Sequence, residues 1–105
     1  MVRTGLIVKL EAKAGKEAEL ASFLVDALPS VEDEPETIVW LAIRAGETSF
    51  AIVDAFPDDG GRRAHLAGPV AEALGQRADD LLAEPPRIEH VDVLAAKVPT
   101  EVRPQ

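Results

Sequence analysis

The start of the chain alternates between apolar and polar positions. From Gly5 to Lys13 the even-numbered residues are apolar, while Lys9, Glu11 and Lys13 lie on the other face. A period of two is typical of a β-strand with one buried face. Similar apolar runs bounded by turn residues predict three further strands, at residues 37–43, 49–56 and 87–96.

Between these strands the apolar spacing changes to three and four residues, which predicts helices. One apolar stripe runs from Leu20 to Leu28, and we expect this helix to stop at Pro29 because proline disrupts a helix interior. A second helix opens at Pro57-Asp58 and should be short, because Gly60-Gly61 weakens its first turn. A third follows Gly68-Pro69, with its apolar stripe ending at Leu81.

The order β-α-β-β-α-β predicts an α+β fold, a ferredoxin-like sandwich in which a four-stranded antiparallel sheet carries its helices on one face. Residues 37–43 and 49–53 are apolar on both sides. The second face of the sheet therefore needs a cover, most economically the same face of another copy. We expect a homodimer, a dimeric α+β barrel, with one domain over residues 1–97 and a tail over 98–105.

Composition narrows the classes of partner. The chain of 105 residues has a formal net charge of −8 and no dense stripe among its 11 basic residues, so nucleic acid and anionic membrane surfaces are unfavourable partners. No apolar run approaches the roughly 18 residues of a membrane span. Without cysteine, the chain fits a reducing compartment, and we expect a cytoplasmic location. We expect no metal site, because the two histidines, His65 and His90, lie far apart.

One acid interrupts the third apolar strand. Asp54 shares a strand face with Ile52 and Phe56, which should meet the helices, and His65 lies in the next helix. A bare buried charge costs several kcal/mol or more, so Asp54 must pair, face water or line a cavity. Desolvation in a cavity would make it a better proton acceptor. The structural alternatives are an Asp54 bound to backbone or to Arg62, and a His65 that caps or packs.

These residues resemble a known family. The strand with Asp54, Phe56 and Asp58, followed by a helix with Gly61 and His65 in A-x-x-x-H-like spacing, is similar to the antibiotic biosynthesis monooxygenase family of dimeric α+β barrel proteins. The resemblance extends from Gly5 to about Lys97. Phe56 stands where studied members tend to have tryptophan, and Val8 stands where the haem-degrading branch has asparagine.

The resemblance implies a cofactor-free oxygenation. In that reaction a bound aromatic or quinol compound loses a proton, and its anion reacts with dioxygen. By this reading Asp54 or His65 is the base, Val8, Ile52, Phe56 and Trp40 contact the substrate, and no cofactor or metal is bound. The alternative is a non-catalytic dimeric barrel that binds a small ligand. Haem degradation ranks below both.

The side of the sheet on which Trp40 lies depends on the hairpin loop. A two-residue loop at Gly46-Glu47 would turn Trp40 into the dimer barrel, whereas a three-residue loop would turn it toward the helices. Sequence alone favours the barrel side.

Overall fold

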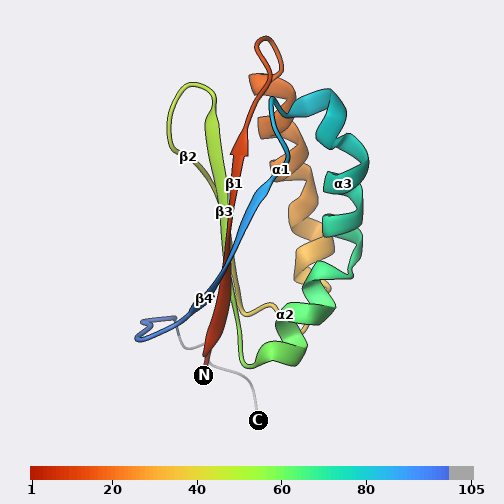
Figure 1. Cartoon of the computed structure of the whole chain (residues 1–105). Helices are drawn as coiled ribbons and strands as arrows, with labels where there is room; N and C mark the ends of the chain where they lie inside the picture. The colour runs from red at the N-terminus through yellow and green to blue at the C-terminus, as the bar shows by residue number, and fades with distance from the viewer. Residues whose placement is uncertain (100–105) are drawn as a thin grey trace.

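A computed structural model describes residues 1–99 as a four-stranded antiparallel sheet with three helices packed on one face (Figure 1). The elements in chain order are β1 (Thr4–Glu11), α1 (Glu17–Glu32), β2 (Val39–Arg44), β3 (Ser49–Phe56), α2 (Asp59–Leu66), α3 (Pro69–Leu81) and β4 (Arg87–Asp92). The strand order β2-β3-β1-β4 is that of a ferredoxin-like fold, which confirms the predicted fold class. The predicted tail begins at residue 98, and its residues 100–105 lie outside the described part.

Local sequence explains most of the element boundaries. Gly15 adopts a positive φ of 86° in the turn before α1. The Asp58 side chain accepts the N–H of Gly61 at 3.0 Å, which caps α2 despite its glycine pair. Pro69 occupies the first turn of α3, where its missing N–H costs nothing. Helix α2 is short, as the two glycines predict.

Two predicted boundaries are wrong. Helix α1 continues through Pro29 to Glu32, because Val31 extends the buried stripe of Leu20 and Leu24 by two more turns. Apolar burial of this kind outweighs one disrupted backbone hydrogen bond. Strand β4 ends at Asp92, so the last part of the predicted strand has no partner strand.

The core lies between the sheet and the helices. It consists of apolar side chains from β1, β3, α1 and α3, including Leu6, Leu10, Leu20, Leu24, Ile52, Phe56, Leu74 and Leu81. Phe56, Leu6, Leu20 and Leu81 are fully buried. The helices thus cover one face of the sheet and leave the other uncovered by this chain.

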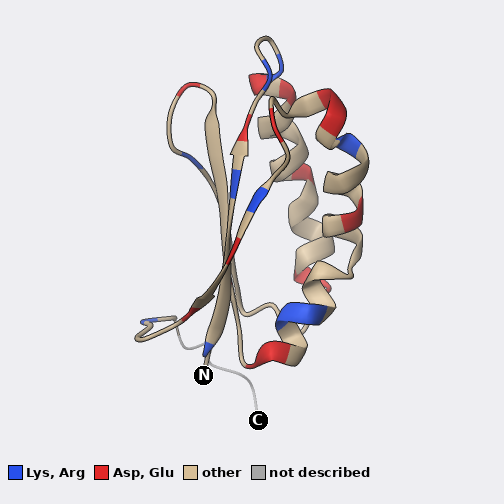
Figure 2. Cartoon of the chain, viewed as in Figure 1, with Lys and Arg blue, Asp and Glu red and all other residues tan. Residues whose placement is uncertain are grey.

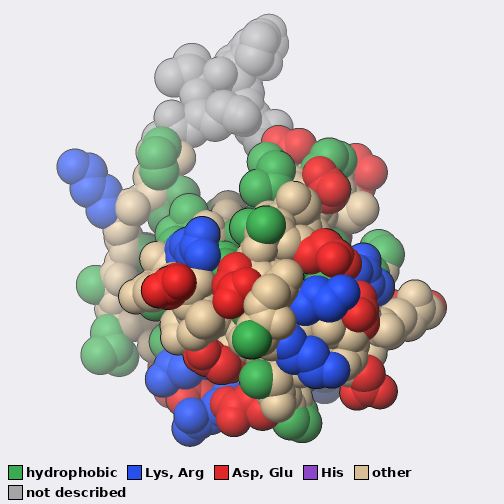
Figure 3. Space-filling model, turned by 90° about the horizontal axis from the view of Figure 1, so that it is seen from above, with side chains coloured by type: hydrophobic (Ala, Val, Ile, Leu, Met, Phe, Trp, Pro, Cys, Tyr) green, Lys and Arg blue, Asp and Glu red, His purple; other side chains and the backbone are tan. Residues whose placement is uncertain are grey.

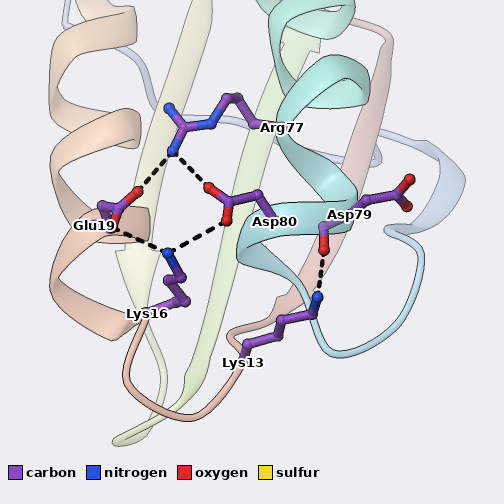
Figure 4. Close-up of polar contacts among 6 residues, drawn as sticks. All are labelled: Lys13, Lys16, Glu19, Arg77, Asp79 and Asp80. Carbon is purple, nitrogen blue, oxygen red and sulfur yellow. Dashed lines mark hydrogen bonds and ion pairs between the residues drawn. The ribbon is translucent and has the colours of Figure 1, made fainter.

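A polar network ties α1 to α3 at their ends (Figure 4). Arg77 contacts Glu19 at 2.7 Å and Asp80 at 3.1 Å, and Lys16 lies 3.3 Å from Asp80. Because these side chains are half-exposed, each pair adds little stability by itself. Their main effect is to fix how the two helices sit over the sheet.

The other charges lie on the helices, the loops and strands β1 and β4, whereas the β2 and β3 ribbons carry few (Figure 2). Seen from above, acidic and basic side chains are intermixed over the surface, with no large patch of one sign (Figure 3). In the described part, no helix is long and apolar enough to cross a membrane.

Candidate functional site

Asp54 is the most deeply buried acid in the described part of the chain. It is 2% exposed and lies on β3, on the face that meets the helices. Strand register places it opposite Leu6 of β1 and Trp40 of β2. Gly5 allows the close strand approach here, because a Cβ at this position would lie 2.7 Å from the backbone oxygen of Asp54. The backbone around Asp54 is therefore tightly held.

His65 reaches Asp54 from α2. Its Nε2 lies 3.0 Å from Oδ2 of Asp54, and its side chain is 8% exposed. Oδ2 of Asp54 therefore has the imidazole as its partner, whereas Oδ1 is buried without a hydrogen-bond partner among residues 1–99. Neither structural alternative for Asp54, a hydrogen bond to the backbone or a contact with Arg62, is found among residues 1–99. The Arg62 guanidinium pairs with Asp59 at 2.8 Å instead.

A second carboxylate, Glu34, holds the other side of the ring. Its Oε1 lies 2.6 Å from Nδ1 of His65 and accepts the hydroxyl of Thr37 at 2.7 Å. Glu34 comes from the connection between α1 and β2, so three separate segments meet at the imidazole. Phe56 packs beside the ring, with centroids 5.5 Å apart.

The pKa of His65 reflects two opposing influences. Burial is the largest single influence and lowers the pKa, but the interactions with Asp54 and Glu34 together outweigh it and raise the pKa above its usual 6.5. The two carboxylates, one at each ring nitrogen, therefore favour the charged form of the ring.

Asp54 and His65 line a cavity of about 100 Å³ between the sheet and helices α2 and α3. The rest of its wall is apolar, including Leu6, Val8, Ile52, Val70, Leu74 and Ile88. Ile88 is half-exposed on β4, an edge strand, so the cavity lies close to the sheet edge. A larger hollow of about 740 Å³ near Met1 and Ile38 has no acid or histidine among its lining residues.

The predicted site residues divide into two groups. The structure brings Asp54, His65, Val8 and Ile52 together around the cavity. Phe56 contacts the His65 ring but is fully buried and does not line the cavity. Trp40 packs partly buried against the core, on the same side as Asp54.

The position of Trp40 corrects the sequence-based preference. Arg44 pairs with Phe50, and Ala45 bonds to Ser49, which leaves the three-residue loop 46–48. That loop length turns Trp40 toward the helices rather than into a dimer barrel. Its indole N–H is buried without a hydrogen-bond partner among the described residues.

Sequence reasoning missed Glu34 and Thr37. Glu34 is one of several acids in a stretch that reads as a solvated loop, and nothing in its spacing marks it as a partner of His65. Only the close approach of this connection to α2 gives it a role. Among residues 1–99, no cluster of three or more acids, histidines or cysteines is arranged to hold a metal ion.

Comparisons with solved structures place this geometry among known folds. A protein of unknown function from Nitrosomonas europaea is 48% identical, with a TM-score of 0.94 over 96% of this chain and 98% of that one. Two proteins described as "putative antibiotic biosynthesis monooxygenase" share the fold. One, from Caulobacter crescentus, is 21% identical, with a TM-score of 0.78 over 90% of this chain and 92% of its own.

The other, also from Nitrosomonas europaea, is 17% identical, with a TM-score of 0.79 over 88% and 90% of the two chains. These two likenesses establish the fold alone. No family model and no curated protein matches the chain.

Proposed function

This chain belongs to the same family as the Nitrosomonas europaea protein of unknown function, and from that premise we propose that it is a cofactor-independent monooxygenase acting on a small phenol or quinol. One observation carries the proposal. Asp54 is a buried carboxylate that has His65 at Oδ2 but no hydrogen-bond donor at Oδ1 in the described chain, and it faces an apolar cavity. A buried acceptor of this kind is costly unless a ligand donor satisfies it.

The chemistry assigned to each residue follows from the geometry. Asp54 takes the proton of the substrate hydroxyl, and the charged His65 beside it stabilises the carboxylate before the transfer. The apolar wall excludes water, so the resulting aromatic anion stays reactive. Because a carboxylate at each ring nitrogen favours the charged form of His65, we assign it as the charge partner and Asp54 as the base.

The oxygenation step balances without a cofactor. A ring carbon of the anion forms a bond to dioxygen, which is reduced to a peroxide while the ring is oxidised by two electrons. The peroxide oxygen then recovers the proton held by Asp54, giving a hydroperoxide. The O–O bond and the C–H bond of the same ring carbon then break, which leaves a quinone carbonyl and releases the second oxygen atom as water. The residues around the cavity supply the base, the counter-charge and the dry surroundings.

Cavity size limits the substrate. At about 100 Å³ the cavity is smaller than the roughly 150 Å³ space that encloses benzene. We propose that the hydroxyl-bearing edge of one ring enters and that the rest of the molecule extends past Ile88 at the edge strand.

The small cavity also favours one alternative, a non-catalytic protein that binds a small hydroxylated ligand. Its volume lies well below the 300–1,000 Å³ typical of small-molecule sites. In either case we propose a homodimer, because this chain leaves one sheet face uncovered.

Oxygen uptake with a panel of simple phenols and quinols tests the proposal. We expect the wild type to consume oxygen and Asp54→Asn to lose at least about 100-fold in rate, as expected when an acid–base group is removed. Asp26→Asn, an exposed acid on α1, is the matched control and should keep full activity. Binding of a quinol without oxygen uptake would support the alternative, and full activity of Asp54→Asn would contradict the assignment of the base.

A further inference from the structure

Glu34 is the one charged group among residues 1–99 that contacts His65 without reaching the cavity. Its Oε1 accepts a hydrogen bond from Nδ1 of His65 at 2.6 Å. The residues that line the cavity include Asp54 and His65 but not Glu34. A carboxylate can only accept a hydrogen bond, so the proton of this contact belongs to Nδ1. Nε2, the opposite ring atom, is thereby directed to Asp54.

We infer that Glu34 is the positioning residue of this site, which fixes the orientation and charge of His65 so that Asp54 keeps an oxygen free for a ligand. Its catalytic consequence rests on the proposed function, but the positioning itself does not. The same oxygen of Glu34 also accepts the Thr37 hydroxyl, and that second contact holds the carboxylate toward the ring. Glu34 is largely buried, with 17% of its side chain exposed, so solvent screens this contact only weakly.

Among residues 1–99, the charged side chains that contact His65 are Asp54 and Glu34, so no third one is in place to replace Glu34. From β3, the charged group that faces His65 is Asp54, and from the α1–β2 connection it is Glu34. On α2 itself, Arg62 is turned away toward Asp59 and the backbone oxygens of Gly5 and Val91. The part of α3 at the cavity is apolar, with Val70, Ala71 and Leu74.

Removing the charge of Glu34 should therefore lower the pKa of His65. Through the ring, the same change should affect Asp54, which Glu34 does not contact. Burial of the ring lowers the pKa, and only Asp54 would then remain to raise it. The imidazole should therefore lose its proton at a lower pH. A neutral ring no longer provides Asp54 with a counter-charge. If the protein consumes oxygen, Glu34→Gln should lower kcat more than it changes KM.

Side-chain NMR of the two histidines tests the inference without any substrate. The probe is the pH titration of His65 in the full chain, with His90 as an internal reference. We expect the His65 midpoint to lie above that of Glu34→Gln and to be unchanged in Glu36→Gln. Glu36 is an exposed acid of the same connection and has no contact with the His65 ring among the described polar contacts, which makes it the matched control.

Two further readouts keep the test decisive. If Glu34→Gln fails to fold, the wild type alone decides, because Nδ1 of His65 should carry a proton at pH 7 whether the ring is charged or neutral. In an oxygen-uptake assay, Glu34→Gln should lower kcat by about 10- to 100-fold, less than loss of the base itself.

An unchanged His65 midpoint in Glu34→Gln, or an unprotonated Nδ1 in the wild type at pH 7, would overturn the inference whatever the oxygen uptake. A lowered midpoint in a protein that never consumes oxygen would support the positioning role and count only against the proposed function.

Discussion

At the scale of single residues, the cluster of Asp54, His65 and Glu34 combines strong burial with incomplete pairing. His65 contacts a carboxylate at each ring nitrogen, but Asp54 has this contact at Oδ2 alone and no partner at Oδ1 among residues 1–99. An internal acid that served only to hold the fold would be expected to have all its acceptors satisfied. The pattern is instead that of a group kept available for a ligand.

His65 makes folding stability depend on pH. Its pKa is raised in the folded protein above the usual 6.5, so the folded state binds a proton that the unfolded state releases more easily. The contribution is fully present below about pH 6.5 and is lost as pH rises through the folded pKa. We expect the difference in free energy of unfolding between wild type and His65→Gln to shrink across this window, as measured by urea denaturation. A difference that grows with pH would contradict the sign.

The sequence pointed to Asp54 and His65 but not to Glu34, because only the first two stand out from their neighbours. Asp54 and His65 stand out in the sequence because one interrupts an apolar strand and the other follows it on a helix. Glu34 does not stand out, because an acid in an acidic loop normally faces water. Its role arises from a contact between segments that are 31 positions apart, which no local pattern records.

At the scale of elements, the regular apolar patterns predicted the helices and strands well, whereas the ends of elements and the loops between them were predicted less well. Strand β3 matches its predicted bounds, because its apolar run ends in clear turn residues on both sides. Helix α1 exceeds its prediction, because burial of Val31 overrides the local effect of Pro29. The side of Trp40 was decided by one loop residue, which reverses the facing of a whole strand.

Two helical glycines provide an element-scale prediction. Gly75 on α3 has no heavy atom within 4 Å of a Cβ built at its position, so Gly75→Ala should raise the free energy of unfolding by about 0.5–1 kcal/mol through helix propensity. Gly61 on α2 differs, because a Cβ there would lie 3.1 Å from Cβ of Glu36 and 3.3 Å from Cβ of Phe56.

We therefore expect Gly61→Ala to lower the free energy of unfolding, since this crowding should cost more than the gain in helix propensity contributes. Thermal and urea denaturation of the two variants side by side would check both signs. Equal stabilisation by the two substitutions would show that the packing around Gly61 is looser than described.

At the scale of the whole molecule, the uncovered sheet face is the main unexplained surface. It presents Leu41 at 54% exposed and Ile43 at 44% exposed, with Val53 and Ile7 beside them. Its charged side chains gather on β1 and β4, where Lys9 lies 3.6 Å from Glu89. Apolar surface of this kind on a folded domain commonly marks an interface.

We expect light scattering at micromolar concentration to give about twice the chain mass of 11.2 kDa. Leu41→Lys should shift the protein toward monomer, because it places a charge in the apolar patch. Gln76→Lys is the control, since Gln76 is exposed on α3, one of the helices that cover the other face of the sheet. A monomeric wild type would remove the barrel architecture while leaving the site within one chain intact.

The central claim is that Asp54 is retained for chemistry rather than for folding, and the stability of Asp54→Asn tests it most directly. Asparagine removes the desolvation cost of a buried carboxylate whose Oδ1 has no partner, and His65 keeps Glu34 as its partner or can lose its proton. The account predicts an unchanged free energy of unfolding or a gain of about 0.5–2 kcal/mol by urea denaturation, as for other functional sites that trade stability for activity. A loss of about 2 kcal/mol or more, with Asp26→Asn unaffected, would show that Asp54 is a structural residue and contradict the account.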